Sequence, residues 1–271
     1  MGLIKALFYC LMRAKPHIMR RMKNKKVINI LKAVATFIMV LAICASGVLL
    51  FHNYYYELIY VSGSSMNPTL NGANGEAVGS VVDFGIVDTH NSAKKNIKRF
   101  SIVSTYYPDS TDYNLETNTL RKNAKKKIKR IIALPNETFK ITKGKLYVLN
   151  KDNNYDLVTY TFKTQPSVEE EYEGKDMGPL TLGNNEYWVL GDHRDASRDS
   201  YTINKPIKYE NIHGVLVAIE GKGTLYIKEY QCTNCGKKFK SMSSGLCDRC
   251  YGEIEAIYDI NNKQYRWPTY Y

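Results

Sequence analysis

The feature that most constrains this chain is a run of 19 residues without a charged side chain, Ala33–Phe51. A helix of this length is sufficient to cross a hydrocarbon core about 30 Å thick. Residues 1–32 before it hold nine Lys and Arg side chains and no acidic one. Because basic flanks stay on the cytoplasmic side, we expect a cytoplasmic segment at 1–32, one transmembrane helix at 33–53 and an extracytoplasmic remainder.

Three tyrosines, Tyr54–Tyr56, follow the apolar run, and amphipathic rings favour the membrane interface. A cleaved signal peptide is the alternative, but the apolar run exceeds the usual signal-peptide core and the basic leader is long. The formal net charge is +12, yet the chain beyond residue 32 holds 29 basic and 26 acidic side chains. We therefore expect membrane lipid as a partner and no nucleic acid.

Beyond Tyr54 the chain alternates short stretches rich in Val, Ile, Tyr and Thr with turn residues, and it shows no sustained 3.6-residue apolar period. This pattern predicts a mainly β domain over residues 54–228, with a surface excursion at about 150–185. The expected strands are one near Val78–Val82, Phe100–Tyr107, Lys129–Leu134, Lys145–Leu149, Leu157–Phe162, Tyr187–Leu190, Val215–Ile219 and Thr224–Tyr230. The expected turns are Pro135-Asn136, Lys143-Gly144, Gly183-Asn184 and Gly221-Lys222-Gly223.

A Gly/Ser-rich stretch, Val61–Leu70 (VSGSSMNPTL), follows soon after the apolar run. Its small residues let the backbone approach another group closely, and Pro68 fixes φ at the exit. Alone, the stretch is equally typical of an ordinary surface loop. It does, however, place several hydroxyl groups close to the expected membrane surface.

A second stretch, Arg121–Arg130 (RKNAKKKIKR), is strongly basic and is typical of a solvated loop that leads into a strand. Lys129 and Arg130, however, are enclosed by Ile128, Ile131 and Ile132. We expect partial burial and the neighbouring guanidinium to lower the pKa of Lys129 from ~10.4 to about 8. A neutral lysine amine can serve as the base that a serine nucleophile needs.

A third stretch, Tyr187–Ser200 (YWVLGDHRDASRDS), runs from a strand into a loop crowded with acids, arginines and serines. Alone, it is equally typical of calcium-binding or ion-paired loops. Together, Ser-Met-x-Pro-Thr-Leu, Lys-Arg-Ile-Ile-x-Leu-Pro and Gly-Asp-x-Arg-x-x-Ser-x-Asp-Ser occur in this order after an expected anchor. In this combination the chain resembles the type I signal peptidases.

The resemblance implies an antiparallel β-sheet serine protease fold and a membrane-anchored Ser–Lys endopeptidase. Such an enzyme removes signal peptides from secreted preproteins, after small residues at −3 and −1. By motif, Ser65 is the nucleophile and Lys129 the general base. The supporting residues are Ser197, which would hydrogen-bond the Lys129 amine, and Arg130, Asp192 and Asp199, with Arg130 and Asp199 as ion-pair members. Shallow substrate pockets would be lined by Val61, Met66 and Ile128.

The chain departs from the family pattern at several supporting positions. Gly63 stands where some relatives place a serine that completes the oxyanion hole. His193 replaces the asparagine usual after Gly-Asp, and Tyr201 replaces the arginine usual after Asp-Ser. Phe100-Ser101 and Asn136-Glu137 replace two Gly-Asp pairs. These departures bear on rate and substrate preference more than on reaction type.

Four cysteines near the C-terminus, Cys232, Cys235, Cys247 and Cys250, form two Cys-x-x-Cys pairs outside the family pattern. Four thiolates with this spacing suit tetrahedral Zn²⁺, whereas an extracytoplasmic location favours two disulfides. We expect a structural zinc ion in a zinc-ribbon-like element over residues 229–271, and no cofactor for catalysis.

Two other functions are compatible with the sequence. One is a catalytically silent, membrane-tethered binding protein that works through its zinc ribbon. The other is a specialised processing protease for a single cargo. The intact Ser65, Lys129, Ser197 and Asp199 set favours an active enzyme over the silent protein.

Overall fold

The computed structural model describes residues 25–72, 78–122, 124–159, 176–240 and 246–270. Residues 1–24 of the expected cytoplasmic segment and residues 160–175 of the expected excursion thus lie outside the described residues. The chain separates into two compact units, Met1–Tyr54 and Tyr55–Tyr271.

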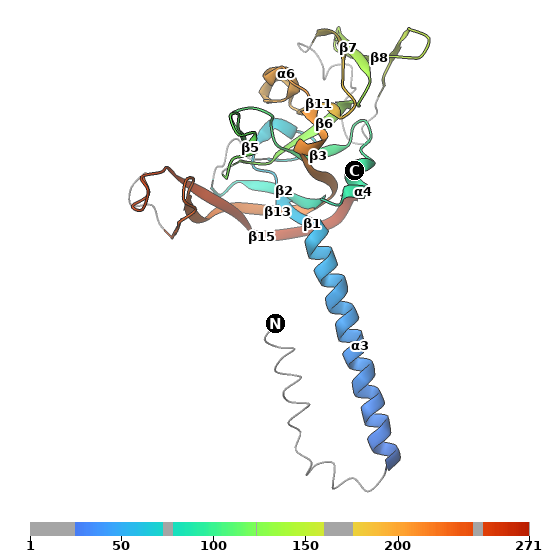
Figure 1. Ribbon diagram of the computed structural model, residues 1–271, viewed down its shortest axis with the longest axis vertical. Coiled ribbons are helices and arrows are strands. Elements are labelled where there is room, and N and C mark those ends of the chain that lie inside the picture. The colour runs from blue at the N-terminus through green and yellow to red at the C-terminus, as the bar shows by residue number, and fades with distance from the viewer. Residues whose placement is uncertain (1–24, 73–77, 123, 160–175, 241–245, 271) are drawn as a thin grey trace. The chain divides into compact units, whose positions relative to one another are not determined.

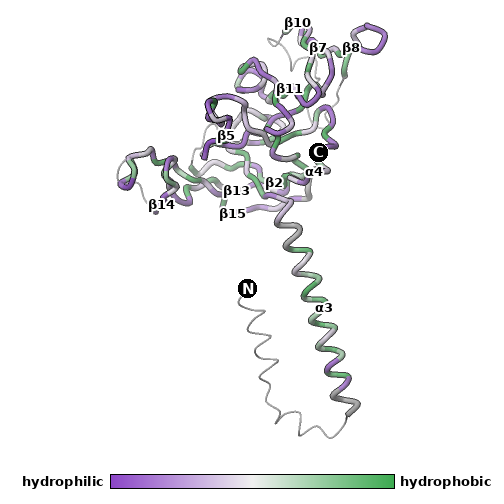
Figure 2. Tube along the Cα trace, viewed as in Figure 1, coloured by the Kyte–Doolittle hydropathy of each residue, from purple (hydrophilic) through white to green (hydrophobic). Residues whose placement is uncertain are grey.

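Helix α3, Lys25–Tyr55, makes up the described part of the first unit and ends at the first residue of the second. Its segment Asn29–Leu49 is long and apolar enough to cross a membrane. Apolar side chains such as Phe37 and Ile43 are exposed, and hydrophobic colour extends along much of the helix in Figure 2. Such exposure is unfavourable in water and favourable in lipid. The expected apolar helix is confirmed, although the helix itself begins earlier, at Lys25.

The second unit is built of antiparallel strands, which confirms the mainly β fold class. Its largest sheet has the order β1-β2-β13-β3-β6-β11-β12, and β14 and β15 also pair with β13. A further sheet, which includes β7 and β8 of Figure 1, has the order β10-β7-β8-β9, and β4 pairs with β5. The strands are β1 (Tyr56–Tyr60), β2 (Val81–Asp88), β3 (Ile102–Thr105), β4 (Tyr113–Asn114), β5 (Thr119–Leu120), β6 (Lys127–Ala133), β7 (Thr138–Thr142), β8 (Lys145–Leu149), β9 (Tyr155–Leu157), β10 (Met177–Thr181), β11 (Glu186–Leu190), β12 (Ile207–Lys208), β13 (Ile212–Cys232), β14 (Lys238–Phe239) and β15 (Ile254–Tyr270). The short helical segments are η1 (Ser64–Met66), α4 (Asn91–Lys95), η2 (Arg194–Ala196), α6 (Ser200–Ile203) and η3 (Tyr209–Asn211).

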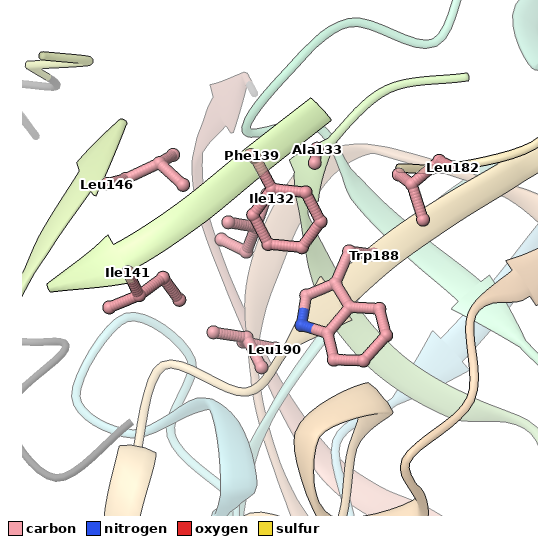
Figure 3. Close-up of a cluster of buried hydrophobic side chains, with 8 residues drawn as sticks. All are labelled: Ile132, Ala133, Phe139, Ile141, Leu146, Leu182, Trp188 and Leu190. Carbon is pink, nitrogen blue, oxygen red and sulfur yellow. The ribbon is translucent and has the colours of Figure 1, made fainter. Parts of the chain in front are cut away.

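Strand β6 lies inside the largest sheet, between β3 and β11, and is buried from Lys129 onward. Ile131 joins one core cluster on this strand and Ile132 joins another. The Ile132 cluster is shown in Figure 3, where Phe139 and Trp188 lie close together, with ring centroids 5.7 Å apart. Successive side chains of a strand point to opposite faces, so both faces of β6 are covered. The charged residues at positions 129 and 130 therefore have little access to water.

Strand β13 is a single strand of 21 residues, where the sequence predicted two strands separated by a turn at Gly221-Lys222-Gly223. That prediction is wrong, because these glycines permit close packing instead of a turn. A Cβ on Gly221 would lie 2.1 Å from the Gln264 carbonyl oxygen. Gln264 belongs to β15, a strand that the sequence did not predict and that returns along β13 (Figure 1).

Other local predictions agree with the structure. Strand β8 has the predicted bounds, and the chain turns before it as expected, with a left-handed backbone of φ 50° at Lys143 and 66° at Gly144. Asn136 likewise has φ of 65° in the turn after β6. These turns follow from local residue preferences, because Gly and Asn adopt positive φ most readily.

Candidate active site

The Ser65 loop, residues 61–72, connects β1 toward β2 and carries the short helical turn η1. Met66 and Leu70 anchor this loop in the core beside Val87 and Ile102. Backbone hydrogen bonds close it internally, from Asn67 N to Ser64 O and from Leu70 N to Met66 O, both at 2.9 Å. The apolar anchors fix the loop, while the serine between them remains available to neighbouring strands.

Ser65 and Lys129, which lie far apart in the sequence, meet across this loop and strand β6. Lys129 Nζ lies 2.6 Å from Ser65 Oγ. The same amine donates to the Ile128 carbonyl oxygen at 2.9 Å. These two contacts aim the amine at the hydroxyl, as a nucleophile and its base require.

The Lys129 side chain is deeply buried, with 3% of its surface exposed. Burial lowers the pKa of Lys129 to about 8, because the charged ammonium loses its water. The charges of Asp199 and Asp192 act to raise this pKa, and the charge of Lys127 acts to lower it. The sequence predicted the value but assigned part of it to the neighbouring guanidinium. Burial is the main cause of the lowered pKa of Lys129, and Lys127 supplies a nearby positive charge that acts in the same direction.

The guanidinium of Arg130 is instead paired with Asp192. Arg130 Nε donates to Asp192 Oδ1 at 2.8 Å and Nη2 to Oδ2 at 2.5 Å, and both side chains are buried. Burial acts to raise the pKa of Asp192, but the hydrogen bonds and charge of Arg130 outweigh it and hold the pKa below its usual value. Asp192 therefore stays ionised, and this pair joins the loop between β11 and α6, residues 191–199 (the Gly-Asp loop), to strand β6.

Within the described residues, Asp199 forms no ion pair of the kind that the sequence predicted. It caps helix α6, accepting hydrogen bonds from Tyr201 N and Thr202 N. It also accepts from Gly191 N at 3.0 Å. Three backbone donors thus satisfy this buried carboxylate, which fixes the shape of the loop between β11 and α6.

Ser197 lies in the same loop, but its predicted hydrogen bond to the Lys129 amine is not formed. The Ser197 hydroxyl is buried and has no hydrogen-bond partner in the described part of the chain. His193 makes a contact that the sequence did not indicate, because its backbone N–H donates to Ser65 O at 3.0 Å. Because the donor is a backbone N–H, this contact does not require an asparagine at position 193.

The three predicted pocket residues come together on one side of the site. Val61 and Met66 belong to one core cluster, and Ile128 packs against it. Val61 and Met66 are 3% and 1% exposed, whereas Ile128 is partly exposed. Val61 and Met66 are thus core residues, whereas Ile128 and Ile59 are only partly buried where they pack against this cluster.

Gly191 lies where the Ser65 loop and the Gly-Asp loop approach each other closely. A Cβ there would lie 2.1 Å from Ser197 Oγ and 2.5 Å from Ser65 O. We expect Gly191→Ala to displace one of the two loops, at a cost of about 1–3 kcal/mol, and to reduce kcat at least tenfold. The matched control is Gly63→Ala, because a Cβ on Gly63 meets nothing within 4 Å. Steady-state kinetics of both variants test this, and equal activities would contradict it.

The four predicted cysteines also come together, at the turn between β13 and β15. Their sulfur atoms lie within 4.8 Å of one another, and all four thiols are free. The Cys232–Cys250 and Cys235–Cys247 sulfur pairs are 3.4 and 3.6 Å apart. A tetrahedral zinc with bonds of about 2.3 Å separates its sulfur ligands by nearly this distance. A disulfide at about 2.05 Å does not fit.

The backbone around the cysteines turns tightly and packs closely against the sulfur atoms. Gly236, directly after the first pair, has φ of 74°, and Gly236 N donates to Cys232 O at 3.0 Å. A Cβ on Gly252 would lie 3.0 Å from the Cys232 sulfur. The donor set and this tight turn therefore fit a structural metal.

One supporting residue was missed from the sequence. Asp83 is buried in β2, and its backbone and side chain bind both ends of the Ser65 loop. The sequence signal is an acid flanked by apolar residues, in Val81-Val82-Asp83-Phe84. A charge at such a position is costly unless it is bound, so it marks a structural role.

Comparison with known proteins shows which family this chain belongs to. The family model described as signal peptidase, peptidase S26, matches residues 30–219. Signal peptidase I V of Bacillus subtilis (strain 168) is 31% identical over 159 residues, which cover 58% of this chain and 80% of that protein. Signal peptidase I P of Bacillus subtilis subsp. natto is 27% identical over 153 residues, 56% of this chain and 69% of that protein.

Among solved structures, a signal peptidase I of Enterococcus faecalis V583 is similar with a TM-score of 0.30 and 24% identity, covering 45% of this chain and 97% of that one. The assignment does not depend on this structure. It depends on the family model, which spans the Ser65 loop, β6 and the Gly-Asp loop. The chain belongs to the signal peptidase family, peptidase S26, and is a serine endopeptidase that cleaves signal peptides.

Proposed function

We propose that Ser65 is the nucleophile and Lys129 the general base, and that cleavage follows small residues at −1 and −3 of the signal peptide. The observation that carries this proposal is the 2.6 Å contact between Lys129 Nζ and Ser65 Oγ, made by a buried lysine. Asp199, Arg130 and Asp192 have supporting roles because their hydrogen bonds hold the loop that faces this pair, and Ser197 supports the same loop by packing against Gly191.

In the first step, neutral Lys129 accepts the hydroxyl proton of Ser65 while Oγ attacks the scissile carbonyl carbon. The Ser65 N–H is a donor for the developing oxyanion. Lys129 then transfers the proton to the leaving amine as the C–N bond breaks, which leaves the signal peptide as an ester on Ser65. Water, deprotonated by Lys129, attacks this ester, and the proton returns to Ser65 Oγ as the carboxylate departs.

The pH dependence of cleavage follows from this mechanism. Because Lys129 must be neutral and burial lowers its pKa to about 8, kcat/KM should rise with pH and level off above this value. Well below it, we expect about a tenfold loss per pH unit. Measurements from pH 6 to 10 test the prediction, with Ser64→Ala as a control that keeps the same profile. A flat profile through pH 7–8 would argue against a lysine base.

Substrate preference is tested with matched preproteins that differ only at −1 and −3. Alanine at both positions should be cleaved, and leucine at either should reduce kcat/KM by up to about a hundredfold, since an apolar surface discriminates by size to this extent. Cleavage of only one natural preprotein in a panel would favour a specialised processing enzyme. The silent binding protein considered from the sequence is not favoured.

The location and the metal are parts of the same proposal. We place residues 1–32 on the cytoplasmic side and the catalytic unit outside, because of the basic residues before Ala33. Protease added to intact spheroplasts should then degrade the chain beyond Tyr54. We also propose that Cys232, Cys235, Cys247 and Cys250 hold a structural zinc ion, which would fix the turn between β13 and β15.

A further inference from the structure

Asp83 binds both ends of the Ser65 loop. Its carbonyl oxygen accepts from Val61 N at 2.9 Å, and its backbone N–H donates to Asn71 O at 2.8 Å. Its side chain accepts from Asn71 N through Oδ2 at 2.7 Å. Because Val61 and Asn71 lie on either side of Ser65, these three bonds set the width of the loop that carries the serine.

The carboxylate of Asp83 is 3% exposed, and its second oxygen, Oδ1, has no hydrogen-bond partner in the described part of the chain. A nearby positive charge stabilises a buried carboxylate oxygen that lacks a hydrogen bond. Arg266 Nη2 lies 3.9 Å from Oδ1. Arg266 comes from β15, which lies beyond the residues that the family model matches.

Three further contacts join β15 to β1 and β2, the strands before and after the Ser65 loop. Tyr60, the residue before Val61, donates its hydroxyl proton to the Tyr258 carbonyl oxygen at 2.9 Å. The Tyr265 ring packs edge-on against Phe84, with centroids 5.2 Å apart. Ile260 shares a core cluster with Val82 and Phe84. β15 therefore supports the strand residues immediately before the Ser65 loop and on both sides of Asp83.

The four-cysteine turn is what returns β15 to this place. β13 and β15 pair from Cys232↔Ile254, beside the turn, to Ala218↔Tyr270, and Figure 1 shows them side by side. In between, Lys222 of β13 pairs with Gln264 on one side and with Asp83 on the other. A shift in register by one residue would direct Arg266 to the opposite face.

We propose that Asp83 and Arg266 are positioning residues for Ser65, and that the four-cysteine turn contributes to catalysis by holding β15 in register. The inference rests on the proposed role of Ser65 as nucleophile. It makes the C-terminal segment a working part of the peptidase, although that segment lies outside the matched family range.

A double-mutant cycle on the full-length chain tests the pair. We expect Arg266→Ala to lower kcat about tenfold, since small displacements of a nucleophile have effects of this order, with KM unchanged. Arg266→Lys should recover most of the loss. Asp83→Asn should also lower kcat, and adding Arg266→Ala to it should cause no further loss. The control is Lys228→Ala, which removes a cation paired with Asp259 on the same hairpin and should leave kcat unchanged. Wild-type kcat in Arg266→Ala, or additive losses, would overturn the proposal.

Hydrogen exchange separates this inference from the proposed function, because it requires no cleavage. The amides of Val61 and Asn71 should exchange about tenfold faster in Arg266→Ala, as expected for local opening, and at the wild-type rate in Lys228→Ala. Stripping metal from the full-length chain with a chelator, or Cys235→Ser, should have the same effect on these two amides. Unchanged exchange in Arg266→Ala would overturn the inference even if Ser65→Ala proves inactive. An active Ser65→Ala enzyme would instead refute the assignment of the nucleophile.

Discussion

Ser65→Ala is expected to lower kcat for signal-peptide cleavage at least about a thousandfold, as does loss of the nucleophile in other serine proteases. The Oγ atom forms the bond to the substrate in the proposed mechanism, and no neighbouring group replaces it. Rates are measured on a preprotein with alanine at −1 and −3. Ser64→Ala and Ser62→Ala are matched controls from the same loop, and both should retain most of the activity.

Substitution of Lys129 should lower kcat to a similar extent, for a different reason. Lys129→Met removes the base but keeps an apolar chain of similar length among the isoleucines, so the fold should be preserved or even stabilised, because no ammonium remains buried. A loss of kcat without a fall in melting temperature would identify the amine as catalytic. If Lys129→Met kept substantial activity, or if Ser64→Ala were the inactive serine variant, the dyad assignment would be wrong.

Much of this site could be predicted because it is encoded locally. Lys129 lies among isoleucines, so its burial follows from the strand pattern, and the expected pKa near 8 agrees with the structure. The pairing of Val103 with Lys129 places that lysine in the middle of the sheet. The left-handed turn at Lys143-Gly144 follows from the same kind of local preference.

What could not be predicted depends on contacts between distant segments. Gly221 and Gly223 are turn residues by type, and the pairing of β13 with β2 on one side and with β15 on the other makes them residues of a continuous strand. Strand β15 itself contains Asn261-Asn262-Lys263-Gln264, which no strand pattern favours. Its pairing with β13 stabilises a sequence that would not form a strand alone. The Asp83–Arg266 contact depends on this pairing and therefore could not be predicted from the sequence.

The second large effect is expected at the ion pair between Arg130 and Asp192. Both side chains are buried, and the two hydrogen bonds between them are 2.8 and 2.5 Å long. Arg130→Met leaves the Asp192 carboxylate buried without its main partner, because Arg194 Nη1 is 3.7 Å from Asp192 Oδ1 and also donates to the Gly191 carbonyl oxygen. We expect this variant to lose about 3–5 kcal/mol in the free energy of unfolding.

Removing both charges should be far less costly than removing one. In Arg130→Met combined with Asp192→Leu, no buried charge is left unpaired, and apolar side chains of similar volume fill the space. The double variant should therefore be more stable than Arg130→Met alone, and the two single losses should not add. Urea unfolding of the full-length chain in detergent measures all four free energies of the cycle. Additive losses would show that each residue acts through other neighbours.

Activity gives a second readout, because the Gly-Asp loop carries the His193 N–H that binds Ser65 O. If the pair positions that loop, the double variant should be folded but should cleave more slowly than the wild type. Its stability is restored, whereas the link between β6 and the loop is not.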